Sequence, residues 1–360
     1  MGALVLDDAV LPRARRRVAD AEELLTGRAA LLGLASRGRI SAGGATRLFP
    51  TIDGWCALTL SRDDDLACVP ALVEADDTAG WPDIERWAAA RTAEQVRDRA
   101  TLLDLPVAIL AEAVPNQPRT QRIGPPGAPR DPAGLLVVDL TSMWAGPLCA
   151  QLLARAGAAV VKVESPRRPD GTRAGDPRFF DWMNAGKLSY AAEFDRDRAA
   201  VAALLRAADV VLESARPTAL GGRGLGPHDL PARPGRVWVR ITGHGTDGQH
   251  AGRVAFGDDA AVAGGLVGHD GDGPVFLGDA LADPLTGIEA YGAVTDALGR
   301  GGGELVEVAM AQVAAGYRPT RPRQSAVTPR PPRIVGTAAA LGDDNTAVDD
   351  MVAEKLGTPC

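Results

Sequence analysis

Residues 134–316 alternate between short apolar runs and helical patterns, and this alternation restricts the fold more than any other feature of the sequence. The runs that predict buried strands cover residues 135–140, 159–164, 209–214, 237–242 and 305–310. The helical patterns between them cover residues 144–156, 196–207, 259–267 and 284–298. Strands that alternate with helices in this way form parallel βαβ units. We therefore expect an α/β fold with a doubly wound, Rossmann-like parallel sheet, whose ligands bind at the carboxyl ends of its strands.

Two proline-rich segments, 113–133 and 317–334, contain little apolar sequence and are interpreted as linkers. The residues before the first segment predict a second, smaller α+β domain with a leading helix. Its expected elements are a helix at 14–36, a strand at 54–60, helices near 80–103 and a strand at 106–112. The expected division is 1–112 for the small domain, 113–133 for a linker, 134–316 for the Rossmann-like domain, and 317–360 for a linker with a C-terminal helical tail.

The composition argues against two kinds of partner. Aromatic residues make up only 4% of the chain, so platforms for stacking nucleic-acid bases are not expected, and the net charge of −7 disfavours a general polyanion binder. No stretch approaches 18 uninterrupted apolar residues, so we expect no membrane span. The N-terminus carries early aspartates and no secretory signal, so a cytoplasmic location is the simplest expectation.

Cysteine and histidine spacing gives no sign of a metal site. No two cysteines form a C-x-x-C pair and none has a histidine at ligand spacing, so we expect no metal and thiols that are buried or incidental. The residues concerned are Cys56, Cys68, Cys149, Cys360, His228, His244, His250 and His269.

The segment ADPLTG at 282–287 leaves two interpretations of Asp283 open. An aspartate before a proline and a periodic apolar run is a common helix N-cap, because its carboxylate accepts free backbone N–H groups. A carboxylate held at a helix start also has a fixed place and a controlled pKa, as a nucleophile requires. Spacing alone favours the cap.

The first strand–helix unit, VVDLTSMWAGPLCAQLL, lacks the glycine pattern of a dinucleotide site. A Rossmann dinucleotide motif has G-x-G-x-x-G directly after the strand, whereas this unit has the single glycine Gly146. A dinucleotide-dependent redox enzyme is therefore a poor fit. Glu164 ends the second strand, where an acidic side chain often binds a ribose hydroxyl, although a solvated charge is an equally good interpretation.

Several motifs in unbroken order resemble the family III CoA-transferases of the CaiB/BaiF type, which include formyl-CoA transferase, carnitine CoA-transferases and 2-methylacyl-CoA racemases. The motifs are DLTSMWAGP, GAAVVKVESP, FFDWMNAGKLS, DVVLESARPTALGGRGLG, VWVRITGHGTDG, ADPLTG and LVEVAMAQV, between Asp139 and Val313. Each is weak alone, but their order is specific. The N-terminal part resembles the small domain of the family, which usually follows the nucleotide-binding half and here precedes it.

The resemblance implies that Asp283 is the catalytic nucleophile of an enzyme that moves CoA between an acyl-CoA thioester and a carboxylic acid. An aspartyl covalent intermediate divides the exchange into easier steps and preserves the thioester energy. CoA and acyl-CoA would be substrates, with no permanently bound cofactor. The resemblance also implies that the glycine segment SAGGA, with Gly43 and Gly44, covers the reacting acyl group.

CoA contacts implied by the resemblance lie in the Rossmann-like domain, which would be the CoA-binding domain. The family often has a basic residue where Ser165 stands, and Arg167 or Arg168 could replace it. The implied contacts are Ser142, Trp144, Ala145, Glu164, Ser165, Asn184, Lys187, Ser214, Ala215, Arg216 and Arg223.

Two alternatives to a CoA-transferase stay open: an acyl-CoA racemase or isomerase, and a non-catalytic CoA-binding partner subunit. The racemases of the family place a histidine where this chain has Phe256, and no histidine lies within a few residues of it, so transferase chemistry is favoured. The expected partners are an acyl-CoA and a small carboxylic acid, with no nucleic acid and no membrane. The resemblance further implies a homodimer of interlinked chains, although the altered domain order can remove the interlinking.

Overall fold

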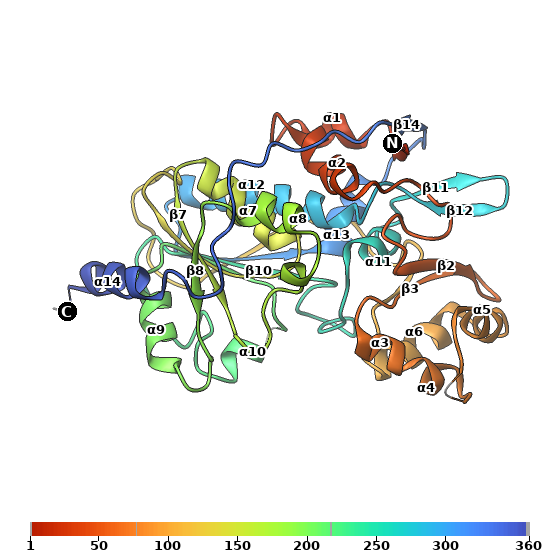
Figure 1. Ribbon diagram of the computed structural model, residues 1–360, viewed down its shortest axis with the longest axis horizontal. Helices are drawn as coiled ribbons and strands as arrows, with labels where there is room; N and C mark the ends of the chain where they lie inside the picture. Colours follow the sequence, from red (N-terminus) through yellow and green to blue (C-terminus); the bar gives the residue numbers. More distant parts are fainter. Residues whose placement is uncertain (1, 77, 217, 358–360) are drawn as a thin grey trace. The chain divides into compact units, whose positions relative to one another are not determined.

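The computed structural model describes residues 2–76, 78–216 and 218–357, and these form two compact units (Figure 1). Unit 1 consists of Met1–Gln117, Gly243–Leu285 and Ala309–Pro332. Unit 2 consists of Pro118–Thr242, Thr286–Val308 and Arg333–Cys360. Cys360 and the end of the expected C-terminal tail, 358–360, lie outside the described residues. The division of the sequence at the two proline-rich segments stays a prediction.

Unit 2 is built on a seven-stranded sheet with the order β5-β13-β10-β9-β6-β7-β8. The pairs β10–β9, β9–β6, β6–β7 and β7–β8 are parallel, and the edge strand β5 runs antiparallel to β13. The strands are β5 (Arg119–Arg122), β6 (Leu136–Leu140), β7 (Ala159–Glu164), β8 (Leu188–Ala191), β9 (Val210–Glu213), β10 (Val237–Thr242) and β13 (Glu304–Ala309). Among the parallel strands, the order reverses between β6 and β9, as in dinucleotide-binding folds. The predicted α/β fold with a parallel sheet is confirmed.

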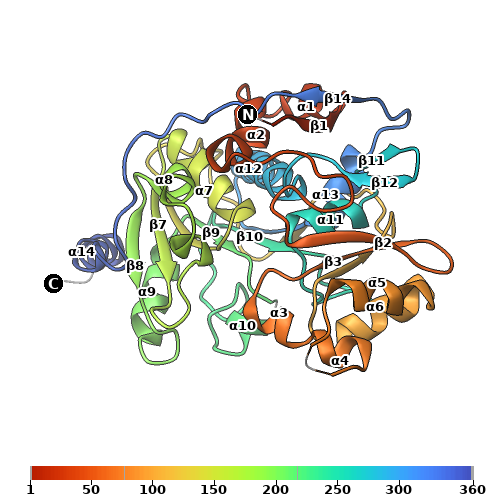
Figure 2. The same cartoon turned by 45° about the vertical axis from the view of Figure 1, so that its right-hand side comes forward.

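Helices cover both faces of this sheet, so central strands such as β6 and β9 are buried and mostly apolar on both sides. Helices α9 and α14 share one core with β6, through residues such as Leu136, Val201 and Val348. Helices α7 and α12 lie on the opposite side of the sheet (Figures 1 and 2). The helical segments are α7 (Ala145–Arg155), η1 (Gly171–Ala174), α8 (Pro177–Asn184), α9 (Arg198–Ala207), α10 (Thr218–Gly221), α12 (Ala282–Gly299) and α14 (Asn345–Leu356).

The last described segment of unit 2 follows the free edge of β8 before it forms α14. The backbone N–H of Ser189 donates to the Asp344 carboxylate at 2.8 Å, and that of Ala191 donates to the Asn345 side chain at 2.8 Å. The Gly342 N–H donates to the Ser189 hydroxyl at 3.1 Å. These bonds satisfy polar groups of an edge strand that would otherwise face solvent.

Unit 1 contains three small antiparallel sheets with helices packed around them. The strands are β1 (Leu4–Asp7), β2 (Thr46–Pro50), β3 (Trp55–Thr59), β4 (Val107–Ile109), β11 (Val267–Asp270), β12 (Gly273–Phe276) and β14 (Gln324–Val327). The helices are α1 (Val10–Ala14), α2 (Ala21–Leu32), α3 (Asp63–Ala67), α4 (Val69–Val73), α5 (Trp81–Ala89), α6 (Ala93–Leu102), α11 (Gly257–Ala263) and α13 (Met310–Tyr317). Strands β2, β3 and β4 form the largest of these sheets, and α5 and α6 share its apolar core.

Two expected helices of unit 1 differ in their limits. The pattern at 14–36 predicts one long helix, but the structure has α1 and a separate α2 that begins at Ala21. The pattern at 259–267 predicts a helix through Val267, but α11 ends at Ala263, where Gly264 and Gly265 follow, and Val267 starts β11. Glycine favours helix termination, which explains the second difference. Among the described residues, no helix has both the length and the apolar character needed to cross a bilayer.

Candidate functional site

A cluster of four aspartates, Asp258, Asp259, Asp279 and Asp283, lies in unit 1 together with Arg28. Asp258 and Asp259 occupy the first turn of α11, Asp283 occupies the first turn of α12, and Asp279 lies in the turn before α12. Arg28 reaches the cluster from α2 and pairs with Asp279, with Nη1 2.6 Å from Oδ1. The motif residue Asp283 is therefore one of several carboxyl groups that share a confined environment.

Asp283 is partly exposed, and within the described part of the chain its carboxylate accepts no hydrogen bond. Helix α12 begins at Ala282, and the backbone N–H of Asp283 itself donates to the Ala280 carbonyl at 2.9 Å. The capping interpretation requires the carboxylate to accept a backbone N–H, so this interpretation is wrong. The carboxylate instead lies against Gly257, where an added Cβ would come 2.4 Å from Asp283 Oδ2. Only glycine fits this close approach.

Two of the neighbouring aspartates, Asp258 and Asp259, accept hydrogen bonds from neutral donors. Asp258 Oδ1 accepts the Ala280 N–H at 3.0 Å, and Asp259 Oδ1 accepts the Thr59 hydroxyl at 2.8 Å. In the described part of the chain, Oδ2 of Asp259 and Oδ2 of Asp279 are buried without a hydrogen-bond partner. Buried carboxylate oxygens without donors disfavour the charged form.

Burial and mutual repulsion accordingly raise the pKa values in this cluster. Burial, followed by the charge of Asp258, raises the pKa of Asp283 to about 7, although Arg28 acts in the opposite direction. Burial raises the pKa of Asp258 to about 6 and that of Asp259 to about 7. The pKa of Asp279 is also raised by burial, against the charge of Arg28. Asp283 therefore changes its charge close to neutral pH, which is typical of residues in reactive sites.

The predicted glycine segment lies beside the same cluster. Ser41 begins a tight turn in which the Gly44 N–H donates to the Ser41 carbonyl at 2.9 Å, and Gly44 has φ 86°, which favours glycine. An added Cβ on Gly43 would lie 3.5 Å from Arg28 Nη2. The structure thus brings together the two motifs that the sequence assigns to the reacting end, Gly43–Gly44 and Asp283, around Arg28.

Unit 2 has a pocket of about 310 Å³ at the carboxyl ends of its parallel strands. Leu140 ends β6, Ser165 follows β7, Glu193 follows β8 and Glu213 ends β9, so the pocket lies where the strand order reverses. This is the place where sheets of this kind bind their ligands. The lining residues are Leu140, Ser165, Arg167, Arg168, Glu193, Phe194, Asp195, Glu213, Ala215, Ala219, Leu220 and Arg223.

Three of the predicted CoA contacts line this pocket: Ser165, Ala215 and Arg223. Both suggested substitutes for a missing basic residue, Arg167 and Arg168, line it as well. Three further predicted contacts, Ser142, Ser214 and Arg216, are exposed, whereas Trp144 and Ala145 are buried at the start of α7. Trp144 packs edge-on against Phe179, with ring centroids 5.4 Å apart. The pocket therefore brings together only part of the predicted set.

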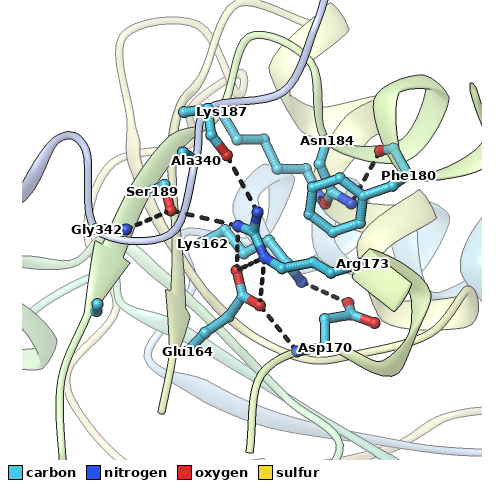
Figure 3. Close-up of polar contacts among 12 residues, drawn as sticks. Lys162, Glu164, Asp170, Arg173, Phe180, Asn184, Lys187, Ser189, Ala340 and Gly342 are labelled. Carbon is cyan, nitrogen blue, oxygen red and sulfur yellow. Dashed lines mark hydrogen bonds and ion pairs between the residues drawn. The ribbon is translucent and has the colours of Figure 1, made fainter. Parts of the chain in front are cut away.

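Glu164 is buried and engaged by the protein itself (Figure 3). Its Oε2 lies 2.7 Å from Arg173 Nη2, and its Oε1 accepts the Asp170 N–H at 2.9 Å. The Arg173 guanidinium lies over the Phe180 ring at 4.3 Å from the centroid and donates to the Ala339 carbonyl at 3.2 Å. In this arrangement Glu164 links β7 to the C-terminal segment, and its contact with a ribose stays a prediction.

Lys187 and Asn184 are also buried in unit 2. The Lys187 ammonium donates to Asp139 Oδ2 at 3.0 Å, to the Pro147 carbonyl at 2.9 Å and to Asn184 Oδ1 at 3.0 Å. An ammonium has three N–H donors, so these acceptors use all of them. A contact of Lys187 or Asn184 with CoA stays a prediction, and their present role is to support the start of α7.

A second buried lysine supports the turn after β6. Lys162 Nζ lies 2.8 Å from Asp170 Oδ2 and donates to the Thr141 carbonyl at 3.1 Å. The Asp170 carboxylate also accepts the Met143 N–H, at 3.1 Å to Oδ1. This ion pair therefore fixes the backbone of the turn that contains the predicted contact Ser142.

The sequence reasoning did not single out Arg28, Asp258 or Asp259. The segment AFGDDAAVAGGL has two adjacent aspartates directly before an apolar helix, and aspartates are seldom buried, so the sequence does not mark them as part of a buried site. Arg28 has no motif around it, and only the fold places it beside Asp279. Within 2–76, 78–216 and 218–357, no group of three or more histidine, cysteine, aspartate or glutamate side chains is arranged to hold a metal ion.

Comparisons with known proteins agree with the motif order. A family model described as CoA-transferase family III matches residues 133–340. A succinate–glutarate CoA-transferase of Agrobacterium fabrum is 31% identical over 231 residues, which cover 57% of this chain and 57% of that protein. A probable fatty acyl-CoA transferase of Mycobacterium tuberculosis is 34% identical over 212 residues, which cover 54% of this chain and 53% of that protein. This chain thus matches little more than half the length of either relative. A crystal structure of a CAIB/BAIF family protein from Brucella suis gives a TM-score of 0.48 at 31% identity, covering 52% of this chain and 55% of that chain.

Proposed function

Because this chain belongs to CoA-transferase family III, we propose that it transfers CoA from an acyl-CoA thioester to a carboxylic acid through a covalent intermediate on Asp283. The observation that carries this proposal is the state of the Asp283 side chain. It is partly exposed, accepts no hydrogen bond in the described part of the chain, and lies against Gly257. A carboxylate without donors is more nucleophilic than one stabilised by hydrogen bonds, because no bond must be broken before it attacks.

In the first half of the reaction, the Asp283 carboxylate attacks the thioester carbonyl carbon of the donor. The C–S bond breaks, CoA leaves as a thiolate, and a mixed anhydride forms. The thiolate then attacks the aspartyl carbonyl of the anhydride, which gives an aspartyl-CoA thioester and releases the donor as a free carboxylate. Covalent catalysis of this kind divides one difficult exchange into several easier displacements.

In the second half, the acceptor carboxylate attacks the aspartyl-CoA thioester and displaces the CoA thiolate. The thiolate attacks the acceptor carbonyl of the new anhydride, so that acyl-CoA leaves and the Asp283 carboxylate returns. The turn at Gly43–Gly44 would cover the reacting group, and its backbone N–H groups are suited to an oxyanion. Since the pKa of Asp283 is raised to about 7, the ionised and reactive fraction increases as the pH rises through that value.

The pocket of unit 2 supports a place for the nucleotide end of CoA. Arg167, Arg168 and Arg223 provide positive charge for its phosphates at the ends of β7 and β9. Arg223 pairs with the exposed Asp195, with Nε 2.7 Å from Oδ1, and such an exposed pair is weak enough to open for a phosphate. Arg223→Ala is expected to weaken CoA binding by roughly 1–3 kcal/mol, which calorimetry would measure.

The decisive variant for the transferase reaction is Asp283→Asn. An amide cannot form the anhydride, so turnover with CoA donors and dicarboxylic or monocarboxylic acceptors should fall by several orders of magnitude while the fold is kept. Asp98→Asn on the exposed surface of α6 is the matched control, because Asp98 is exposed and pairs with its neighbour Arg97 at 2.9 Å. Wild-type turnover in Asp283→Asn would disprove the nucleophile. A wild-type protein that binds CoA without any turnover would favour the non-catalytic partner subunit.

An acyl-CoA racemase or isomerase is a second candidate, and Asp258 is the observation that favours it. The pKa of Asp258 is raised to about 6 by burial, and its charge acts on Asp283, so two acid–base groups lie close together in unit 1. A racemase would exchange the α-proton of its substrate with solvent, whereas the transferase would retain an α-deuterium through turnover. Mass spectrometry of an α-deuterated acyl-CoA after reaction separates the two.

Assembly and location belong to the same proposal. We propose a homodimer with an interface well above the standard ~1,600 Å², in a reducing cytoplasm, with an acyl-CoA and a small carboxylic acid as partners. Light scattering at micromolar concentration should give twice the chain mass. A monomeric mass would contradict the dimer but leave the chemistry of Asp283 untouched.

A further inference from the structure

Arg28 lies among the four aspartates of unit 1 and has no place in the proposed chemistry. Its Nη1 is 2.6 Å from Asp279 Oδ1, and the Asp279 side chain is 1% exposed. The guanidinium also lies beside Gly43 of the glycine turn. Helix α2, which carries Arg28, therefore connects the turn that would cover the substrate with the segment that leads into Asp283.

The charged groups around Asp283 come from three elements. Helix α11 contributes Asp258 and Asp259, the turn before α12 contributes Asp279, and α2 contributes Arg28. The three carboxyl groups oppose ionisation of Asp283, whereas the guanidinium favours it. Like charges that share a buried site prevent each other from ionising unless a cation compensates them.

We propose that Arg28 is a positioning residue that compensates the charge of Asp279 and so increases the fraction of Asp283 in its ionised, nucleophilic form, while it also orients the glycine turn at Gly43. The inference rests on the proposed role of Asp283 as the nucleophile. Arg28 touches neither substrate nor the reacting atoms in this account. It acts through Asp279 and through the field that its charge produces at Asp283.

The account predicts opposite shifts for two single substitutions. Arg28→Gln removes the compensating cation, so the titration midpoint of Asp283 should rise by roughly one pH unit or more, the scale of a nearby opposite charge. Asp279→Asn removes a repelling carboxylate, so the midpoint should fall. Arg28→Lys keeps the positive charge and should restore most of the wild-type midpoint. A merely structural role for Arg28 would not give shifts of opposite sign.

The measurement is a carbon-13 NMR titration of the full chain labelled at the aspartate carboxyl carbons. Asp283→Asn identifies the Asp283 signal by removing it. Arg15→Gln is the control, because Arg15 is half exposed, pairs with Glu22 and is not among the charges that shift the pKa of Asp283. An unchanged midpoint in Arg28→Gln, or shifts of the same sign in both variants, would overturn the proposal. If Arg28→Gln does not fold, Asp279→Asn decides alone: a lower midpoint supports the proposal, and an unchanged or higher one contradicts it.

The titration needs no turnover, so a result against the role of Arg28 can be distinguished from a result against the transferase reaction. If Asp283→Asn keeps full activity, the proposed function is wrong whatever Arg28 does to the midpoint. If Asp283 is required and its midpoint does not respond to Arg28, only the positioning role is wrong. In the supporting case, the pH at which turnover reaches half its maximum should follow the NMR midpoint through the same variants.

Discussion

Two buried aspartates of unit 2, Asp139 and Asp170, have pKa shifts opposite to those of the aspartate cluster in unit 1. In unit 2, burial alone would raise the pKa of Asp139, yet Lys187 and Lys162 lower it below its ordinary value. Asp170 behaves in the same way, with Lys162 at 2.8 Å. In unit 1, burial raises the pKa values of Asp258, Asp259 and Asp283, because Arg28 is not enough to compensate the cluster.

This difference in pKa shift distinguishes aspartates that stabilise the fold from the aspartate proposed to react. Each buried aspartate of unit 2 has a lysine and further donors, so its charge is fixed and its side chain holds the backbone in place. The Asp283 carboxylate has no donor in the described residues and changes its charge near neutral pH. The same residue type therefore becomes structural or chemical according to its partners, which is the expected relation between perturbed pKa values and function.

Removing one partner of a paired charge should give the largest loss of stability. Lys187→Met leaves Asp139 fully buried without its nearest cation, so the free energy of unfolding of unit 2 should fall by roughly 3–5 kcal/mol. Hydrogen exchange of the amides in β6 and α7 would measure the effect within unit 2. Lys355→Met is the control. Lys355 is partly exposed and lies 3.4 Å from the buried Asp209, which keeps Arg130 and Arg233 as partners, so the loss should be less than about 1 kcal/mol. Equal effects of the two substitutions would contradict the special cost of removing Lys187, whose pair with Asp139 is buried on both sides.

Removing a charge from the cluster of unit 1 should instead change the pH dependence of stability. The folded-state pKa of Asp259 is raised to about 7, above the ordinary 3.8, so its contribution to stability is fully present below pH 4 and is lost as the pH rises to about 7. Asp259→Asn keeps an acceptor for Thr59 without the ionisation. Between pH 4 and 8, the wild type should lose on the order of 3 kcal/mol relative to this variant.

Chemical denaturation at several pH values would measure this difference. Asp176→Asn is a suitable control, because the Asp176 carboxylate is partly exposed and paired with Arg178 at 2.6 Å, which lowers its pKa. If the wild type instead loses stability relative to Asp259→Asn as the pH falls, Asp259 is charged and compensated in the folded state, like Asp139 and Asp170 of unit 2.

The smallest effect is expected at the edge of β8, where a single carboxylate accepts a backbone N–H. Asp344→Ala removes the acceptor of the Ser189 N–H and should cost about 1–2 kcal/mol, seen as faster hydrogen exchange of β8. Asp344→Asn keeps an acceptor oxygen and should restore most of this loss. If alanine and asparagine behave alike, the hydrogen bond does not hold the C-terminal segment to β8.

The sequence predicts the sheet of unit 2 well because its signal is local. The runs at 159–164 and 237–242 coincide with β7 and β10, since buried parallel strands are continuously apolar. The edge strands β5 and β14 were not predicted. Both are polar and lie within the proline-rich segments 113–133 and 317–334, and their pairing with β13 and β1 depends on distant residues. Apolar periodicity does not contain that information.

The sequence predicts those residues of the candidate site that stand in a motif, and it does not predict those that only the fold brings to the site. Asp283, Gly43 and Gly44 stand in recognisable segments, and the structure places them in one unit. Arg28 lies 251 residues from its partner Asp279 along the chain, so no local pattern connects them. Lys187 and Asn184 were predicted as CoA contacts from their motif, but the motif does not reveal that their polar groups are used within the protein.

The most direct test of Asp283 as the nucleophile is to trap the aspartyl intermediate. The wild-type protein is incubated with a panel of acyl-CoA thioesters, treated with hydroxylamine, digested and mapped by mass spectrometry. The account predicts a hydroxamate on Asp283 that requires acyl-CoA, appears more readily above pH 7 than below it, and is absent from Asp283→Asn. A hydroxamate on another carboxyl group, or none on Asp283 in a protein that turns over, would contradict the account.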